Sequence, residues 1–486
     1  MKLSKLVQKL NYKVLKGSID VDVSSVVYDS RKIKQDAVFV CIKGTIRAGQ
    51  DFIPEMMKKG AIAFIVEQED IQLEDGFTYI LVENARIALA EMSAAYFDYP
   101  AEKLKKIGIT GTKGKTTTAY MVKSILEASG YKTGLIGTIE SIIGEKHISS
   151  VNTTPESYVI QETFRKMVDE GVEVVVMEVS SQALMMHRVD GLVFDIGVFT
   201  NLEPDHIGGF EHKDFNDYMQ CKSKLFRNCK HGIFNGDSPY LEGIMKGHTC
   251  DVETFGYDAD NDIRASKIEL LKTQGALGVK YHLSGKVDYD ISVNVPGEFS
   301  VYNSLAAIAI CNQFGADEEK IKSALNNISI RGRVEIVPVP KPYTIMIDYA
   351  HNAMALESLL TTLRLYGPAR LICMFGCGGN RAKARRYEMG EVSSRLADLT
   401  VITSDNPRNE EPMEIINDIL IGVKKAEGAY VAVPDRKEAI RYCMKMAQDG
   451  DIIVLAGKGH ENYQEIKGVK YVMDERELIA DIIKEV

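Results

Sequence analysis

Three features are missing from the sequence, and each absence excludes a class of protein. No apolar run is long enough to cross a bilayer, and the first residues, MKLSKLVQKL, are amphipathic rather than signal-like. The eight cysteines include no C-x-x-C pair, which argues against a zinc site and a disulfide framework. The formal net charge of −9 leaves no pervasive basic field for nucleic acid. We therefore expect a cytoplasmic protein with reduced thiols, no membrane insertion and no nucleic-acid partner.

The size and composition of the chain are those of an ordinary globular protein. Its 486 residues predict about three domains, and 26% of them are charged. Local basic clusters occur at 103–106 and 381–386. These clusters could serve anionic substrates, although a solvated basic surface is the simpler explanation.

The segment 105–118, KKIGITGTKGKTTT, has the composition of a phosphate-binding loop. Its apolar run at 107–110 predicts a strand, 111–114 a tight glycine loop, and 116–129 a helix. In that arrangement backbone N–H groups and the positive end of the helix dipole converge on an anion.

Two side chains of this segment have the positions that nucleotide triphosphate chemistry requires. Lys115 would reach the β- and γ-phosphates, and the Thr116 hydroxyl would ligate Mg²⁺. The strict pattern G-x-x-x-x-G-K-[ST] is not met, because Ile109 occupies the position of its first glycine. A surface turn is the alternative, but the flanking strand and helix favour a nucleotide site.

Strands and helices alternate between 104 and 331, which predicts a parallel sheet with crossover helices. One apolar run ends at Glu178, and a later one is followed by Asp205 and His206. Because the carboxyl ends of parallel strands face one crevice, Glu178 and His206 could hold a divalent ion near the phosphates.

Other polar residues of this region have simpler explanations. Thr154 could cap the next helix with Pro155 in its first turn, and capping alone would explain both. Lys222 and Lys224 lie on an expected helix at 215–226, where a solvated face is the simpler explanation.

Composition shifts at Asp98-Tyr99-Pro100 and at Arg331-Gly332-Arg333 mark two domain boundaries. We expect domains at 1–103, 104–331 and 332–486. Each main strand expected in the last domain ends in a small, polar loop, which favours a ligand-binding crevice at one edge of its sheet. These strands are expected at 343–347, 370–375, 399–403 and 451–455.

Taken together, these motifs resemble those of the Mur ligases of bacterial cell-wall synthesis, over essentially the whole chain. The family loop T-G-T-x-G-K-T-T matches 110–117 and accounts for Ile109. The other matches are Thr153-Thr154, Glu178-Val179-Ser180-Ser181, Thr200-Asn201-Leu202 with Asp205-His206, and Asp348-Tyr349-Ala350-His351.

The resemblance implies an α/β fold with three domains. These are a UDP-sugar-binding domain at 1–103, a central P-loop ATPase domain with a mainly parallel sheet at 104–331, and a Rossmann-like amino-acid-binding domain at 332–486. It also implies ATP and Mg²⁺ as cofactors and a UDP-N-acetylmuramoyl-dipeptide as acceptor. ATP would phosphorylate the acceptor carboxylate, and the amine of an amino acid would attack the acyl phosphate. We expect a monomer.

The resemblance also assigns the residues of the ATP and metal sites. The implied catalytic residues are Lys115, Lys222, Glu178 and His206, with Thr116, Glu178 and His206 as metal ligands. In YMQCKSKLF at 218–226, Lys222 matches a lysine that the family carbamylates to N6-carboxylysine to support the second Mg²⁺, and Cys221 replaces an alanine. The implied ATP contacts are Gly111, Thr112, Gly114, Lys115, Thr116, Thr117, Asn303, Arg333 and Asp348.

Two further residue sets are implied for the substrates. The acceptor contacts are Ser30, Arg31, Asn84, Arg86, Thr153, Thr154, Ser180 and Arg188. The amino-acid contacts are Arg386, Asp405, Asn406, Pro407, Arg408, Gly457 and Glu461. The segment 405–408, DNPR, resembles members that add meso-diaminopimelate, because a guanidinium can bind the distal carboxylate that lysine lacks. Glu461 is suited to the distal ammonium.

Several positions depart from the family pattern without removing a phosphate or metal ligand. They are Gln50, Gln182, Met186, Ile207-Gly208-Gly209-Phe210, Ala353 and Tyr387. Two alternatives therefore stay open. One is a ligase of the same fold that adds L-lysine or another amino acid, or uses another acceptor, such as folate-polyglutamate or cyanophycin-type ligation. The other is a catalytically inactive nucleotide-sugar-binding paralogue, against which the retained Lys115, Thr116, Glu178, His206 and Lys222 weigh.

Overall fold

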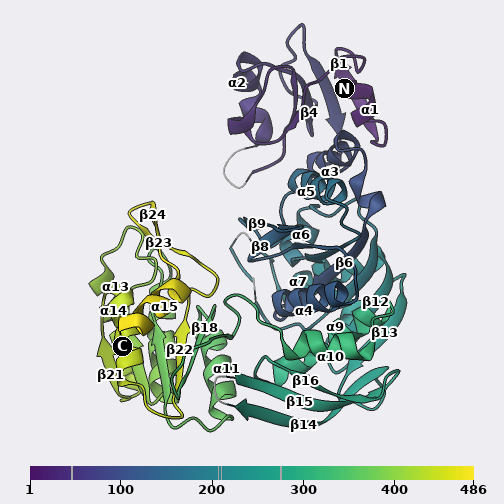
Figure 1. Ribbon diagram of the computed structural model, residues 1–486. Coiled ribbons are helices and arrows are strands. Elements are labelled where there is room, and N and C mark those ends of the chain that lie inside the picture. The colour runs from purple at the N-terminus through teal and green to yellow at the C-terminus, as the bar shows by residue number, and fades with distance from the viewer. Residues whose placement is uncertain (45–47, 206, 210, 274–275, 486) are drawn as a thin grey trace. The chain divides into compact units, whose positions relative to one another are not determined.

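The structure, a computed structural model, describes residues 1–44, 48–205, 207–209, 211–273 and 276–485 (Figure 1). The chain forms two compact units. Unit 1 comprises Met1–Asp262 and Ala306–Asp317, and unit 2 comprises Ile263–Leu305 and Glu318–Val486. The division runs through helix α9 (Glu298–Asn312). The two boundaries between the three domains expected from the sequence remain a prediction.

Unit 1 begins with a five-stranded sheet in the order β1-β5-β4-β3-β2. All neighbours are parallel except β1, which is antiparallel to β5. Helices α1 (Leu3–Leu6) and α3 (Ala85–Tyr96) cover one face, and α2 (Ile53–Lys58) covers the other. Alternate strand residues point to opposite faces, so each face contributes its own apolar side chains to the helices that cover it. The strands are β1 (Tyr12–Lys16), β2 (Val26–Val27), β3 (Ala37–Val40), β4 (Ala61–Val66) and β5 (Thr78–Val82).

The other strands of unit 1 belong to a second sheet, in which they have the order β13-β12-β11-β6-β10-β7-β8-β9. The strands from β13 to β7 are parallel, which confirms the mainly parallel sheet expected from the sequence, and β8 and β9 are antiparallel. The strands are β6 (Lys105–Thr110), β7 (Thr133–Ile136), β8 (Glu140–Ile143), β9 (Lys146–Ser149), β10 (Val174–Glu178), β11 (Phe194–Phe199), β12 (Cys229–Asn235) and β13 (Asp251–Gly256).

Strand β6 lies between β10 and β11, so three strand ends meet at one edge of this sheet. The helices that follow these strands begin at the same edge. They are α4 (Lys115–Ala128) after β6, α6 (Ser181–Met185) after β10 and α7 (Phe215–Ser223) after β11, while α5 (Ser157–Asp169) leads into β10 and α8 (Leu241–Met245) into β13.

Unit 2 contains the antiparallel strands β14 (Ile263–Thr273), β15 (Ala276–Gly285) and β16 (Tyr289–Val293), with α10 (Glu318–Asn326). A six-stranded sheet follows in the order β17-β18-β22-β19-β20-β21, in which only β17 runs antiparallel to its neighbour. Its strands are β17 (Glu335–Val337), β18 (Thr344–Asp348), β19 (Leu371–Phe375), β20 (Leu399–Ile402), β21 (Tyr430–Ala432) and β22 (Ile452–Ala456).

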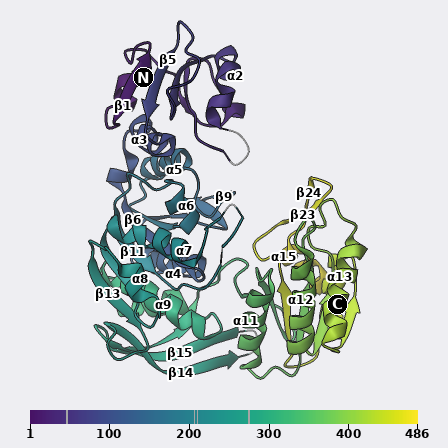
Figure 2. The same cartoon turned by 180° about the vertical axis from the view of Figure 1, so that it is seen from behind.

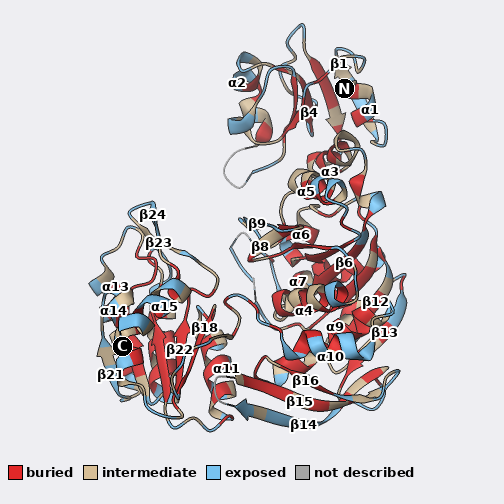
Figure 3. Cartoon of the chain, viewed as in Figure 1, coloured by how far each residue is buried: buried red, intermediate tan, exposed pale blue. Residues whose placement is uncertain are grey.

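Helices cover both faces of the six-stranded sheet (Figures 1 and 2). Helices α11 (Ala353–Arg364), α12 (Lys383–Leu396) and α13 (Pro412–Lys425) contact one face, and α14 (Arg436–Met446) and α15 (Glu475–Glu485) contact the other. The central strands β19 and β22 are continuous apolar runs because both faces are buried (Figure 3). A two-stranded hairpin, β23 (Tyr463–Ile466) and β24 (Val469–Val472), follows β22.

Two further observations concern the whole chain. All eight cysteines are unpaired and buried. Among the described residues, no helix is both long and apolar enough to cross a membrane.

Candidate active site

The glycine loop joins the end of β6 to the start of α4, as the sequence predicts. Gly114 precedes the helix with φ +81°, a left-handed conformation that favours glycine. Gly111 also has a positive φ of +153°, and a Cβ added there would lie 2.0 Å from Thr200 Oγ1. The loop is therefore held closely against the residues that follow β11.

Two side chains after β11 fix the loop conformation. Thr200 Oγ1 donates to the carbonyl of Lys113 at 2.7 Å, and the Lys113 N–H donates to Asn201 Oδ1 at 2.8 Å. The Thr112 hydroxyl lies 3.0 Å from the Tyr218 hydroxyl of α7. The loop is thus preorganised by its neighbours.

Replacing Gly111 with alanine is expected to lower kcat/KM for ATP about 100-fold, because the loop must move away from Thr200 and misplaces the phosphates. Steady-state kinetics at varied ATP would measure the change. Gly130→Ala is the matched control, since Gly130 also has a positive φ (+94°) but has nothing within 4 Å of an added Cβ. Equal ATP kinetics for Gly111→Ala and the natural protein would contradict this account of the loop.

Two lysine amines converge on one carbonyl of the loop. Lys115 Nζ donates to the Gly111 carbonyl at 2.8 Å, and Lys222 Nζ donates to the same oxygen at 2.9 Å. Lys222 is 1% exposed, so the alternative of a solvated helix face is wrong for this residue. Burial, and then the positive charge of Lys115, lower the pKa of the Lys222 amine well below its usual value.

The strand-end carboxylate Glu178 is 1% exposed and accepts three hydrogen bonds. Its donors are the Thr116 hydroxyl at 3.0 Å, the Thr138 hydroxyl at 2.9 Å and the Thr138 N–H at 2.8 Å. Two of the expected metal ligands, Thr116 and Glu178, are therefore in contact. Hydroxyl and carboxylate oxygens are the donors that Mg²⁺ prefers, so these residues fit that ion. His206, the third expected ligand, lies outside the described residues.

The paired threonines have a different role from the capping considered above. Helix α5 begins at Ser157 with Glu156 as its N-cap residue, so Thr154 does not cap it. The Thr154 hydroxyl instead donates to the Glu178 carbonyl at 2.8 Å and accepts from the Ser180 N–H at 3.0 Å. It satisfies the backbone groups where β10 ends. The Thr153 hydroxyl lies 3.1 Å from that of Thr138.

The remaining expected acceptor residues lie in unit 1 on three separate segments. Ser30 and Arg31 belong to a short 3-10 turn, where the exposed Arg31 lowers the pKa of Asp29 by hydrogen bonding. Asn84 caps α3 by accepting from the N–H groups of Arg86 and Ile87. Ser180 caps α6 by accepting from Ala183 N. Arg86 and Arg188 both contact Glu156.

A buried histidine near this site was missed in the sequence. His212 is 1% exposed; its Nδ1 lies 3.0 Å from Asp217 Oδ2 and its Nε2 lies 2.9 Å from Ser181 Oγ. Among the described residues, His212, Asp217 and Cys221 could together hold a metal ion. Because both ring nitrogens already have partners, we interpret His212 as a polar link between α7 and α6. A histidine just before an expected helix was the only signal.

In unit 2 the expected amino-acid residues gather around a buried lysine. Lys458 is fully buried, and its Nζ lies 3.2 Å from Asn406 Oδ1, 3.1 Å from Glu461 Oε2 and 3.6 Å from Asp405 Oδ1. Asn406 Nδ2 also donates to Glu461 Oε2 at 2.9 Å. The structure therefore brings Asp405, Asn406 and Glu461 together around Lys458. The sequence did not indicate a role for Lys458, although this residue lies in the polar loop expected after the strand at 451–455.

Two further residues of the expected amino-acid set, Arg408 and Gly457, have left-handed backbone conformations. Arg408 has a φ of +52°, unusual for a residue other than glycine, and follows Pro407. Its Nη1 donates to the Gly379 carbonyl at 2.7 Å and its Nε to Glu465 Oε2 at 3.3 Å. Gly457 has a φ of +105°, and an added Cβ would lie 3.1 Å from Asp405 Oδ2.

Arg386 is placed differently from the other residues of its set. It is 1% exposed, and it donates to Asp418 Oδ2 and to Glu410 Oε1, each at 2.8 Å. Its charge is therefore already neutralised by two carboxylates of the protein. A contact between Arg386 and an amino-acid substrate remains a prediction.

The expected nucleotide residues Asn303, Arg333 and Asp348 all belong to unit 2. Asp348 accepts from the N–H groups of Val334 at 2.8 Å and Ala350 at 2.7 Å, and burial raises its pKa. The Arg333 guanidinium lies 4.9 Å from the centroid of the Tyr349 ring. A cavity of about 420 Å³ adjoins this region; its lining includes Asn294, Ile328, Ile330, Arg333, Val337 and Arg476.

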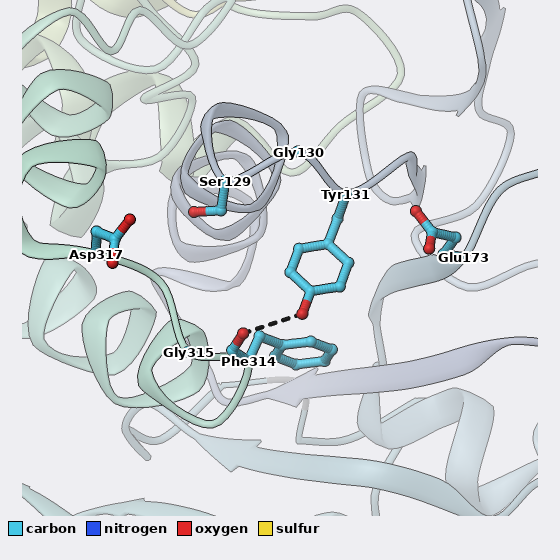
Figure 4. A pocket seen from close by; sticks show the side chains of 7 residues that line it. All are labelled: Ser129, Gly130, Tyr131, Glu173, Phe314, Gly315 and Asp317. Atoms are coloured by element: carbon cyan, nitrogen blue, oxygen red, sulfur yellow. Dashed lines mark hydrogen bonds between the residues drawn. The ribbon is translucent and has the colours of Figure 1, made fainter.

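Another cavity, of about 220 Å³, lies in unit 1 at the carboxyl end of α4 (Figure 4). The Tyr131 hydroxyl points across it and donates to the Phe314 carbonyl at 3.0 Å. Glu173 lines it just before β10 begins, whereas Glu178 lies where β10 ends. This cavity is therefore at the opposite edge of the sheet and includes none of the expected site residues.

Comparison with known protein families gives three matches along the chain. The chain matches the Mur ligase family catalytic domain over residues 22–97, the Mur ligase middle domain over 109–311 and the Mur ligase glutamate ligase domain over 332–459. These three matches, in this order, agree with the three-domain α/β fold expected from the sequence.

Full-length relatives point the same way. A UDP-N-acetylmuramoyl-L-alanyl-D-glutamate--2,6-diaminopimelate ligase of Clostridium perfringens is 46% identical and covers 100% of both chains. A ligase of the same name from Caldanaerobacter subterraneus is 42% identical over 100% of this chain and 99% of its own. A solved structure of a ligase of that name shares the fold, with a TM-score of 0.71 at 24% identity over 100% of this chain and 99% of its own. The chain belongs to the Mur ligase family.

Proposed function

We propose that this enzyme is an ATP-dependent acid–amino-acid ligase that joins meso-diaminopimelate to UDP-N-acetylmuramoyl-L-alanyl-D-glutamate in peptidoglycan precursor synthesis. The full-length relatives of that name support the substrates. The observation that carries the proposal is the pair of contacts at the start of α4: Lys115 and Lys222 both donate to the Gly111 carbonyl, and Thr116 donates to Glu178. We further propose that the enzyme is a cytoplasmic monomer.

The loop and its lysine would hold ATP. Backbone N–H groups at the start of α4 would face the phosphates, and Lys115 would leave the Gly111 carbonyl to neutralise the transferring phosphoryl group. Thr116, Glu178, His206 and the modified Lys222 would hold Mg²⁺. When bound, that ion would neutralise charge on the phosphates and on the acceptor carboxylate.

The buried Lys222 is suited to carbamylation. Burial lowers the pKa of this amine, which favours the neutral form whose lone pair can attack the carbon of CO₂. The new N–C bond gives a carbamate anion, and the displaced amine proton passes to solvent. The modification replaces a buried base with a carboxylate-like ligand, which explains a lysine next to a metal site.

The cluster around Lys458 would bind the amino acid. The Arg408 guanidinium would pair with the distal carboxylate of meso-diaminopimelate, and Glu461 with the distal ammonium. Lys458 holds Glu461 and Asn406 in place from the buried side. L-lysine lacks the distal carboxylate, so it would leave Arg408 without a substrate partner.

Phosphate release from ATP with the UDP-dipeptide tests this proposal. We expect turnover with meso-diaminopimelate and little with L-lysine or with no amino acid. Arg408→Ala should lower kcat/KM for diaminopimelate at least about tenfold, because a charge-assisted bidentate contact is lost. Arg395→Ala is the control, since Arg395 pairs with Glu357 on the surface.

Two outcomes of this assay would change the proposal. Turnover with L-lysine instead would keep the ligase mechanism and overturn the specificity assigned to Arg408. No turnover in any arm would point to another acceptor or to an inactive nucleotide-sugar-binding protein, and would direct attention to Gln50, Gln182 and Met186.

A further inference from the structure

The side chain of Glu156 joins two arginines that come from distant parts of unit 1. Glu156 Oε1 accepts from Arg86 Nη1 at 3.1 Å and from Arg188 Nε at 3.0 Å, and Oε2 accepts from Arg86 Nη1 at 3.2 Å. The three side chains are only 17%, 14% and 12% exposed for Glu156, Arg86 and Arg188. Two guanidinium groups therefore share one carboxylate, which leaves one net positive charge.

Each arginine has a second, backbone anchor. Arg86 Nη2 donates to the Lys43 carbonyl at 3.2 Å, and Arg188 Nη1 donates to the Thr154 carbonyl at 3.0 Å. Thr154 in turn bonds to the Glu178 carbonyl. A continuous chain of hydrogen bonds thus runs from α3, beside the first sheet, to the strand end that carries the catalytic carboxylate.

The position of Glu156 at the start of its helix supports a functional role for its pairing with Arg86 and Arg188. It is the N-cap residue of α5, where side chains usually accept from the first helical N–H groups, yet it makes no such bond. Both of its oxygens are used by the arginines instead. Because Glu156 makes no cap hydrogen bond to α5 but binds Arg86 and Arg188, its position is better explained by the two arginines than by the helix.

We infer that Glu156 is a positioning residue for the anionic acceptor, fixing the spacing of Arg86 and Arg188 so that both can meet its negative charges. This inference rests on the proposed function. Without the carboxylate the two guanidinium groups would repel and separate, because like charges at close range disfavour each other in a partly buried site. With it, the site keeps one positive charge toward a nucleotide-linked acidic peptide.

Glu156→Gln tests the inference because it keeps the size of the side chain and removes its charge. We expect KM for the UDP-dipeptide to rise at least about tenfold, since charge-assisted hydrogen bonds to both arginines weaken. The KM for ATP and kcat should change less than about twofold, a split that a general loss of folding would not give. Glu156→Asp, which keeps the charge, should restore part of the affinity.

The matched control is Glu162→Gln, since Glu162 lies on the same helix and pairs with Lys166 at 3.4 Å on the surface. It should leave every constant unchanged. Calorimetric binding of the UDP-dipeptide without ATP should show the same tenfold weakening in Glu156→Gln. An unchanged or lower dissociation constant would overturn the inference. Glu156 would then have no effect on acceptor binding or would compete with the acceptor for the arginines. Failure of turnover in the natural protein, with this binding difference intact, would refute only the proposed reaction.

Discussion

Lys222→Ala is expected to lower kcat at least about 100- to 1,000-fold, because it removes the anionic ligand that carbamylation would place beside the metal site. The side chain is buried, and its amine already lies on the Gly111 carbonyl of the phosphate loop. The loss should therefore appear in kcat rather than in KM for the amino acid.

Phosphate release at saturating substrates measures the effect, and small carboxylates provide a specific check. Acetate or propionate should restore part of the activity of Lys222→Ala, since a free carboxylate can occupy the space of the carbamate. Lys224→Ala is the control, because Lys224 lies two residues further along the chain and its side chain is only partly buried. Unaltered turnover in Lys222→Ala would end the carbamate proposal.

The lowered pKa of Lys222 also gives a pH dependence with a definite sign. Only the neutral amine reacts with CO₂, and the amine gains its proton as the pH falls through its lowered pKa. Activity in CO₂-depleted buffer should therefore fall toward acidic pH and recover when bicarbonate is added. A bicarbonate effect of equal size in Lys222→Ala would contradict this explanation.

Glu178→Gln is expected to reduce kcat about 100- to 1,000-fold and to raise the Mg²⁺ concentration needed for half-maximal rate. The substitution keeps the shape of a side chain that accepts from Thr116 and Thr138 but removes its charge. The amide nitrogen would also face a donor where the carboxylate had accepted. The lost charge would act on the metal, whereas the misplaced amide nitrogen would disturb the hydrogen bonds from Thr116 and Thr138.

Rates at varied Mg²⁺, with ATP held in excess, separate these two effects. Glu173→Gln is the matched control, because Glu173 comes just before the same strand at the other edge of the sheet. It should behave as the natural protein does. A normal Mg²⁺ profile with reduced kcat in Glu178→Gln would show that Glu178 acts on the loop and not on the ion.

The parts of the site that local sequence controls were predictable. An apolar run, a glycine loop and a helical segment predicted a helix at 116–129, and α4 spans Lys115–Ala128. The carboxylate at the end of a buried strand was likewise predictable, because a continuous apolar run that stops at Glu178 within an alternating strand–helix pattern indicates the end of a buried strand.

The parts that depend on distant partners were not predictable. Thr154 fits a helix cap by sequence, yet its partner Glu178 lies 24 residues away. Glu156 meets Arg86 across 70 residues, and Arg386 meets Asp418 across 32. No periodicity or spacing records such pairs. The role of Lys458 was hidden for the same reason, since Asn406 is 52 residues away.

The burial of every cysteine has a practical consequence for following motion in this enzyme. Because all eight thiols are unpaired yet shielded, reagents such as maleimides should modify the native protein slowly. A single cysteine introduced on the surface of each unit could then be labelled with fluorophores without removing the native ones. Energy transfer between the two dyes would report whether the distance between the labels changes when ATP, acceptor and amino acid bind.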